Sequence, residues 1–137
     1  MSKKKAIIYY CNSTKTGVRC EKRVCTCEDG SKRLEFYSVS NSGLPDTRDT
    51  ITEEQYSTLC SVAESMELEV VDDVVVYEPT YSLDRPGWRK AVGLALLNNA
   101  DIILVLNSMH VTNKRVEYRT LTQGLNSMGV KIVAKVD

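Results

Sequence analysis

The chain has no excess of charge of either sign. Its 18 lysines and arginines are matched by 18 aspartates and glutamates, so no overall field draws it to nucleic acid or to acidic lipids. Any contact with DNA would therefore have to be local. The sequence also lacks an apolar run near the roughly 20 residues that a transmembrane helix needs. Residues 1–5 lead directly into a predicted strand rather than into a signal peptide, so we expect a cytoplasmic protein with no membrane partner.

Histidines and paired cysteine motifs are also scarce. His110 is the only histidine, and the five cysteines, at positions 11, 20, 25, 27 and 60, contain no C-x-x-C pair. An odd number of cysteines in a chain without an export signal favours reduced thiols over a disulfide framework. A zinc site built from Cys20, Cys25 and Cys27 would lack the usual ligand spacing. The sequence therefore predicts neither a metal site nor a cofactor.

What the sequence does contain is the pattern of one compact α/β domain over residues 1–137. Hydrophobic residues make up 42% of the chain and charged residues 26%, which is ordinary for a globular domain of this length. In the second half, helical and strand-like patterns alternate: a helix from Trp88, a buried strand over 102–106, a helix that Gly129 ends, and a strand over 132–136. Such strand, helix and strand runs with short connections form parallel crossover units.

The first half begins with a strand and then departs from simple alternation. Lys5–Cys11 is apolar, β-branched and aromatic, which favours a central strand. Asp29-Gly30 lies between two runs of β-forming residues and predicts a β-hairpin inserted at about 18–40. In the simplest interpretation, this hairpin is a solvent-exposed insertion with charges of mixed sign and no binding role. The alternative is a basic edge that contacts phosphate.

A helix and a strand complete the first half. Thr50 followed by Glu53 has the form of a capping box, and it predicts a helix that ends near Leu68. A valine-rich strand over 70–77 follows, with Asp72 and Asp73 as a possible interruption. In the last helix of the chain, the apolar face is predicted to contain Val116, Leu121 and Leu125.

These elements predict an α/β fold with three layers, a four-stranded, mainly parallel sheet and an inserted β-hairpin, of the resolvase-like or flavodoxin-like type. In such folds, ligands bind beyond the carboxyl ends of the strands. The connections there contain Ser13, Arg85 and His110, which we expect to meet at one edge of the sheet. This edge is the functional site that the sequence predicts.

Two segments resemble the catalytic domain of serine recombinases, the resolvases and DNA invertases. The run DRPGWRKAVGLALLNNADIILVLN over 84–107 is similar to the family's Asp-Arg-Pro-Gly-Leu motif, helix and aliphatic strand. Tyr9 to Thr14 is similar to the family's Tyr-x-Arg-Val-Ser-Thr. Residues 5–14 and 50–136 carry the resemblance, which leaves 15–49 as an insertion. The resemblance implies attack by a serine hydroxyl on a DNA phosphodiester, with arginines that neutralise the transition state.

On this resemblance Ser13 is the nucleophile and Arg85 a phosphate-binding arginine, while Thr14, Lys15 and His110 are further candidates for binding phosphate. Other positions depart from the family. Cys11 stands where an arginine is expected, and residues 109–113, MHVTN, replace Asp-Arg-Leu-x-Arg. Each lost donor to a developing charge costs about a hundredfold in rate. The expectation is a degenerate recombinase-type domain that lacks the family's separate DNA-binding domain.

The function that follows is a binding or regulatory module connected with DNA recombination or mobile elements. Its expected partner is a protein or a second copy of the chain, with weak DNA contact possible. Four alternatives stay open: an active recombinase using Ser13, a flavodoxin-like phosphate or nucleotide binder at 13–17, a cysteine enzyme using Cys11, and a pure interaction module built on the hairpin. Arg85 would equally hold its own loop by pairing with Asp84 or Glu78.

Overall fold

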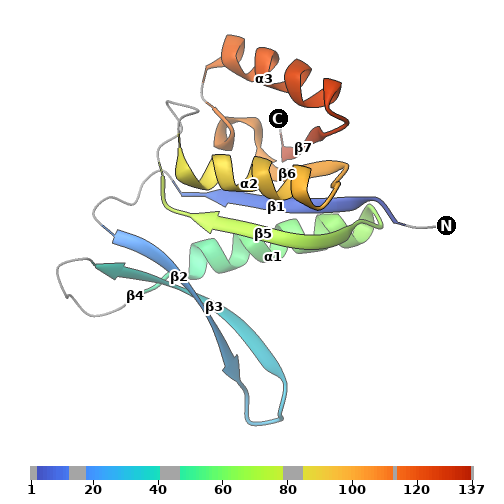
Figure 1. The fold of residues 1–137 in the computed structure, drawn as a ribbon. Helices are drawn as coiled ribbons and strands as arrows, with labels where there is room; N and C mark the ends of the chain where they lie inside the picture. Colours follow the sequence, from blue (N-terminus) through green and yellow to red (C-terminus); the bar gives the residue numbers. More distant parts are fainter. Residues whose placement is uncertain (1–2, 13–17, 41–46, 79–84, 113, 137) are drawn as a thin grey trace.

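The computed structural model describes residues 3–12, 18–40, 47–78, 85–112 and 114–136. Figure 1 shows the chain as a parallel α/β body from which a second sheet projects. In chain order the elements are β1 (Lys5–Cys11), β2 (Val18–Thr26), β3 (Lys32–Ser40), β4 (Thr47–Arg48), α1 (Thr50–Ser65), β5 (Glu69–Val76), α2 (Pro86–Leu97), β6 (Ile102–Asn107), the 3-10 turn η1 (Ser108–His110), α3 (Arg115–Ser127) and β7 (Lys131–Val136).

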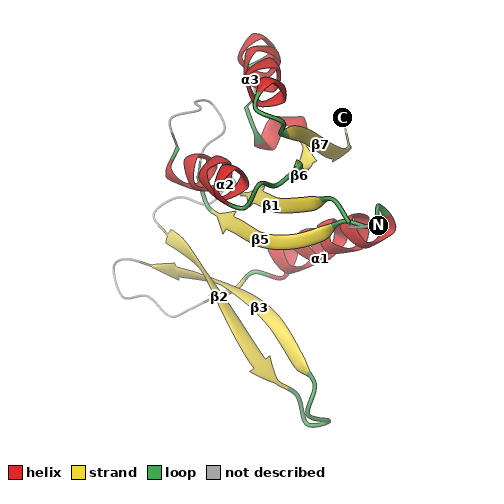
Figure 2. Cartoon of the chain, turned by 45° about the vertical axis from the view of Figure 1, so that its right-hand side comes forward, coloured by secondary structure: helices red, strands yellow, loops and turns green. Residues whose placement is uncertain are grey.

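Four parallel strands form the body, in the order β5-β1-β6-β7. Helix α1 covers one face, while α2 and α3 lie on the other (Figures 1 and 2). The predicted three-layer α/β fold, with Lys5–Cys11 as an inner strand, is therefore confirmed. No helix in the described part of the chain is both long and apolar enough to cross a membrane.

Strand β1 is apolar along its length because it supplies both halves of the core. Ile7, Tyr9 and Cys11 pack into the cluster beneath α2 and α3, and the alternate residues between Ala6 and Tyr10 pack against α1. All six side chains from position 6 to 11 are at most 2% exposed. A strand of a parallel sheet that is covered on both faces needs apolar residues at every position, which explains the continuous apolar run of β1.

The predicted hairpin is present, and its strands β2 and β3 are antiparallel. Val18 lies opposite Ser40 at one end of the pair, and Thr26 lies opposite Lys32 at the other. Gly30 closes the turn with φ +86°, a conformation that favours glycine. The short strand β4, which the sequence did not predict, pairs with β3 and makes a three-stranded sheet. This sheet is anchored to the body by an edge-to-face contact between Phe36 and Tyr56, whose ring centroids are 5.2 Å apart. Its far end projects from the body (Figure 2).

Arginines on the outer face of this sheet are matched by glutamates. Four of the ion pairs are Arg19–Glu21 at 3.0 Å, Arg23–Glu21 at 3.0 Å, Arg33–Glu35 at 2.6 Å and Arg48–Glu53 at 2.7 Å. The Glu35 side chain is only 5% exposed. Hydrogen bonds from Tyr37 and Cys25, together with Arg33, lower the pKa of Glu35 to about 2, so its charge persists at neutral pH. The charges of the hairpin are therefore largely compensated within the protein.

Three local predictions were wrong, the first of which concerns the start of α1. Helix α1 is capped by Asp49 rather than by Thr50: the Asp49 carboxylate accepts hydrogen bonds from the Thr52 amide at 3.0 Å and the Thr52 hydroxyl at 2.6 Å. Glu53, the other half of the predicted capping box, instead accepts from Arg48 and the Phe36 amide. An aspartate directly before a threonine offered two possible caps, and tertiary contacts selected the first.

Val116 was wrongly placed on the apolar face of α3, where it is 78% exposed. The residues that pack toward the sheet are Tyr118, Leu121 and Leu125, spaced as one helical face should be. Residues 72 and 73 do not interrupt β5 either. The strand is continuous and absorbs one extra residue where its register with β1 shifts, between Ala6 and Ile7.

Candidate functional site

Three of the residues singled out by sequence meet at the carboxyl edge of the parallel sheet. Cys11 ends β1, Arg85 directly precedes α2, and His110 lies in η1 after β6. The Cys11 thiol donates to the His110 carbonyl at 3.4 Å, and Arg85 Nη1 donates to the same carbonyl at 3.3 Å. The predicted meeting of the connections that contain Arg85 and His110 is therefore present. Residues 13–15, the predicted nucleophile and two phosphate ligands, lie outside the described residues.

Arg85 is turned into the protein. Its side chain is 2% exposed, Nη2 donates to the Val111 carbonyl, and Nε lies 3.9 Å from Glu78 Oε2. Its guanidinium carbon also lies 5.9 Å from the centroid of the Tyr9 ring. These contacts tie the start of α2 to the loop after β6. The interpretation of Arg85 as a residue that holds its loop through Glu78 thus has direct structural support.

Glu78 is the centre of this network, a role that sequence reasoning did not assign. Its carboxylate accepts hydrogen bonds from the Tyr9 hydroxyl at 2.6 Å, the Gly87 amide at 2.8 Å and the Trp88 amide at 3.1 Å. Arg85, the N-cap residue of α2, makes no side-chain capping bond. Glu78 supplies that cap from the segment just beyond β5, and its negative charge there also suits the helix dipole.

Gly87 explains part of the motif that carries the family resemblance. A Cβ atom at this position would lie 2.5 Å from Glu78 Oε1 and 2.6 Å from Val76 Cγ2. The glycine therefore lets the first turn of α2 approach the Glu78 carboxylate. Pro86, at the first helical position, lacks the backbone N–H that would otherwise need a partner. In this chain, Pro-Gly serves helix entry and close packing.

His110 lies edge-on to Tyr10, with ring centroids 5.3 Å apart. Among the described residues, its buried Nδ1 atom has no hydrogen-bond partner. Burial, with a further contribution from the positive charge of Arg85, lowers the pKa of His110. The ring is therefore mostly neutral at neutral pH, and the role of His110 in binding phosphate stays a prediction.

Cys11 occupies the position at which the sequence resemblance expects an arginine. Its side chain is 1% exposed, and burial raises the pKa of its thiol. The thiolate is the reactive form of cysteine, so these surroundings oppose its use as a nucleophile. All five cysteines are free thiols, and the described residues contain no cluster of three or more potential metal-ligating side chains.

The fold that the four parallel strands and three helices build is similar to that of serine recombinase catalytic domains. Two solved structures share it. The C-terminal catalytic domain of ISC1926 TnpA, an IS607-like serine recombinase, superposes with a TM-score of 0.64 and 18% identity, covering 97% of this chain and 70% of that one. The N-terminal catalytic domain of TP901-1 integrase gives a TM-score of 0.61 and 18% identity, covering 96% and 76%.

At this identity the likeness concerns the fold, and it confirms the fold-level resemblance seen in the sequence. No protein-family model matches the sequence, and no curated protein matches it. The roles of individual residues therefore rest on the geometry of this chain.

Proposed function

We propose that residues 1–137 form a serine-recombinase-like domain connected with DNA recombination, in which strand cleavage is impaired and binding or regulation is the remaining role. The observation that supports this proposal most strongly is the position of Arg85. Its guanidinium is 2% exposed and donates to the carbonyls of His110 and Val111. A phosphate could reach it only if these internal contacts were broken.

Two further positions support impaired chemistry. Cys11 contributes a buried neutral thiol, and His110 contributes a ring whose pKa is lowered by burial. Phosphoryl transfer depends on positive groups already aimed at the charge that develops in the transition state. The absence of such groups at these two positions predicts a loss of at least about a hundredfold in rate, the cost of removing a single donor.

The described core of the fold is nevertheless intact, with both faces of the parallel sheet covered. A domain that has kept its scaffold and lost the cations of its site is suited to binding a protein partner or a second copy of itself. DNA contact would then be local. An active recombinase using Ser13 and a phosphate or nucleotide binder both depend on the loop at 13–17, outside the described residues, so both stay predictions.

The test is covalent capture. The purified chain and its Ser13→Ala variant are incubated with supercoiled and nicked DNA beside an active serine recombinase, and protein–DNA adducts are resolved by denaturing electrophoresis. We expect an adduct from the active enzyme and none from this chain under the same conditions. An adduct formed by this chain that disappears in Ser13→Ala would show that cleavage has survived and would overturn the proposal.

A further inference from the structure

Helix α3 borders two hollows that share a pair of residues. One, of about 350 Å³, is lined by Ser108, Met109, Thr112, Arg115 and Tyr118. The other, of about 300 Å³, continues along the helix and is lined by Arg115, Tyr118, Arg119, Thr122 and Gln123. Because the two share Arg115 and Tyr118, we treat them as one groove, here called the α3 groove, which begins beside η1 and follows α3 from Arg115 to Gln123.

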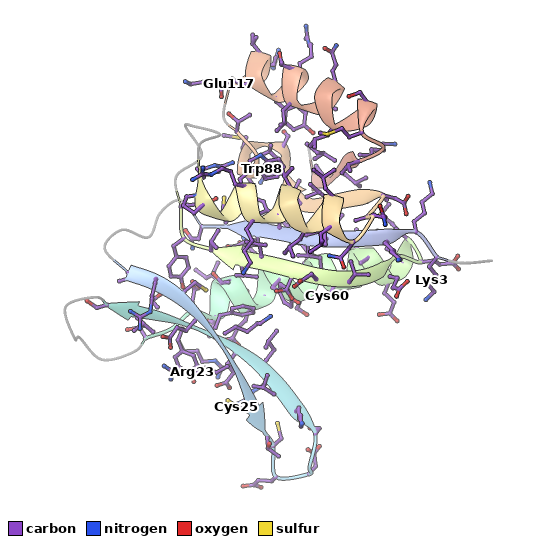
Figure 3. All side chains as sticks on the ribbon, viewed as in Figure 1. Lys3, Arg23, Cys25, Cys60, Trp88 and Glu117 are labelled. Carbon is purple, nitrogen blue, oxygen red and sulfur yellow. The ribbon has the colours of Figure 1, made fainter. Side chains whose placement is uncertain are left out.

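The arginines of the α3 groove differ from those elsewhere in the structure. Neither Arg115 nor Arg119 forms a side-chain hydrogen bond or an ion pair with any residue that the structure describes, and both are exposed. Glu117, the nearest acidic residue along α3 (Figure 3), is engaged by Lys114 at 3.6 Å and by the Thr112 hydroxyl at 3.2 Å. Two positive charges therefore face the groove without a carboxylate to balance them.

This arrangement contrasts with the other places where phosphate binding was expected. The hairpin arginines are held by Glu21, Glu35 and Glu53, and Arg85 is enclosed within the body. The chain has no net charge. An anion is therefore attracted most strongly where arginines have no acidic partner among the described residues, as at Arg115 and Arg119. The groove also contains the hydroxyls of Ser108 and Thr122.

The shape and lining of the groove indicate which polyanion fits. The atoms that line the hollow along α3 are mostly carbon, and the Tyr118 side chain borders both hollows. An arginine-lined groove with an aromatic side chain is the pattern that binds single-stranded nucleic acid, because phosphates meet the guanidinium groups and an unstacked base meets the ring. In a duplex the bases are stacked on one another, so the Tyr118 ring would find no exposed base to contact.

We propose that the α3 groove binds a short segment of single-stranded DNA, with Arg115 and Arg119 on its phosphates and Tyr118 against a base. Along α3 the groove runs from Arg115 to Gln123, which is about 12 Å at a rise of 1.5 Å per residue. The inference goes beyond the proposed function and does not depend on it, because it concerns reversible binding along α3 and not a covalent step at Ser13.

The test is fluorescence anisotropy with a labelled oligothymidylate and the full chain, over a series of salt concentrations. Arg115→Gln/Arg119→Gln is expected to weaken binding at least about tenfold at low salt. It should also reduce the slope of log K against log salt by about 1.4, because each single-strand phosphate contact contributes about 0.7. The matched control, Arg19→Gln/Arg33→Gln, removes the same charge from the hairpin and should change affinity by less than about twofold.

Tyr118→Leu tests the base contact separately. It keeps an apolar side chain toward the core and should weaken binding about tenfold, while the salt slope stays the same. Fluorescence of the buried Trp88 reports whether each variant remains folded. The inference is overturned if the unaltered chain does not bind the oligonucleotide, if both double variants lose affinity equally, or if a duplex of equal length binds more tightly than the single strand.

Discussion

Replacing Glu78 with glutamine is expected to lower the free energy of unfolding by about 3–5 kcal/mol, the range found when one partner of a buried ion pair is removed. The change keeps the size of the side chain, but it removes the carboxylate charge that lies beside Arg85 in the interior. It also sets an amide group against the donors that now point at the carboxylate: the Tyr9 hydroxyl and the amides of Gly87 and Trp88. Urea unfolding followed by Trp88 fluorescence measures the effect.

The control for this change is Glu54→Gln, on the exposed side of α1. It removes the same charge and should alter the free energy of unfolding by less than about 0.5 kcal/mol. The double variant Glu78→Gln/Arg85→Met should be less destabilised than the sum of its single variants, because removing both charges leaves neither buried alone. Additive losses would show that the two side chains act independently, against the network described for them.

Replacing Gly87 with alanine is expected to cost about 3 kcal/mol, at the upper end of the usual range for overpacking a core. The new methyl group would have to occupy space 2.5 Å from Glu78 Oε1 and 2.6 Å from Val76 Cγ2. It would therefore push the carboxylate away from the amides it caps. Urea unfolding again gives the magnitude.

Gly93→Ala is a matched control in the same helix. A Cβ atom there would meet no heavy atom within 4 Å, so the gain in helix propensity should stabilise the protein by up to about 1 kcal/mol. If Gly87→Ala lowers the free energy of unfolding and Gly93→Ala raises it, close packing at the start of α2 is the cause of the loss at Gly87. Equal small effects would mean that α2 can move away from Glu78 at little cost.

Local patterns were sufficient to predict most of the fold. The apolar run of β1 indicated burial on both sides, and Asp29-Gly30 between two β-forming runs placed the hairpin turn at the glycine that has positive φ. The order of strands and helices then placed the connections near Arg85 and His110 at the same edge of the sheet, because parallel strands end together.

The role of each side chain at that edge could not be predicted in the same way. Whether Arg85 faces outward to a phosphate or inward to Glu78 depends on a contact with the end of another strand, and no local spacing encodes it. The α3 groove was missed for a similar reason. Val116 was assigned to the buried face of α3, and the side chains that border the groove became apparent only when the helix was placed against the body.

We infer that the phosphate-binding capacity of this chain lies on α3 and not at Arg85. The most direct test is nuclear magnetic resonance of the arginine side-chain Nε–Hε signals during titration with a short single-stranded DNA, each signal assigned from an arginine-to-lysine variant. We expect the signals of Arg115 and Arg119 to shift with DNA concentration while that of Arg85 stays in place. A shift of Arg85 with unchanged Arg115 and Arg119 would contradict this inference.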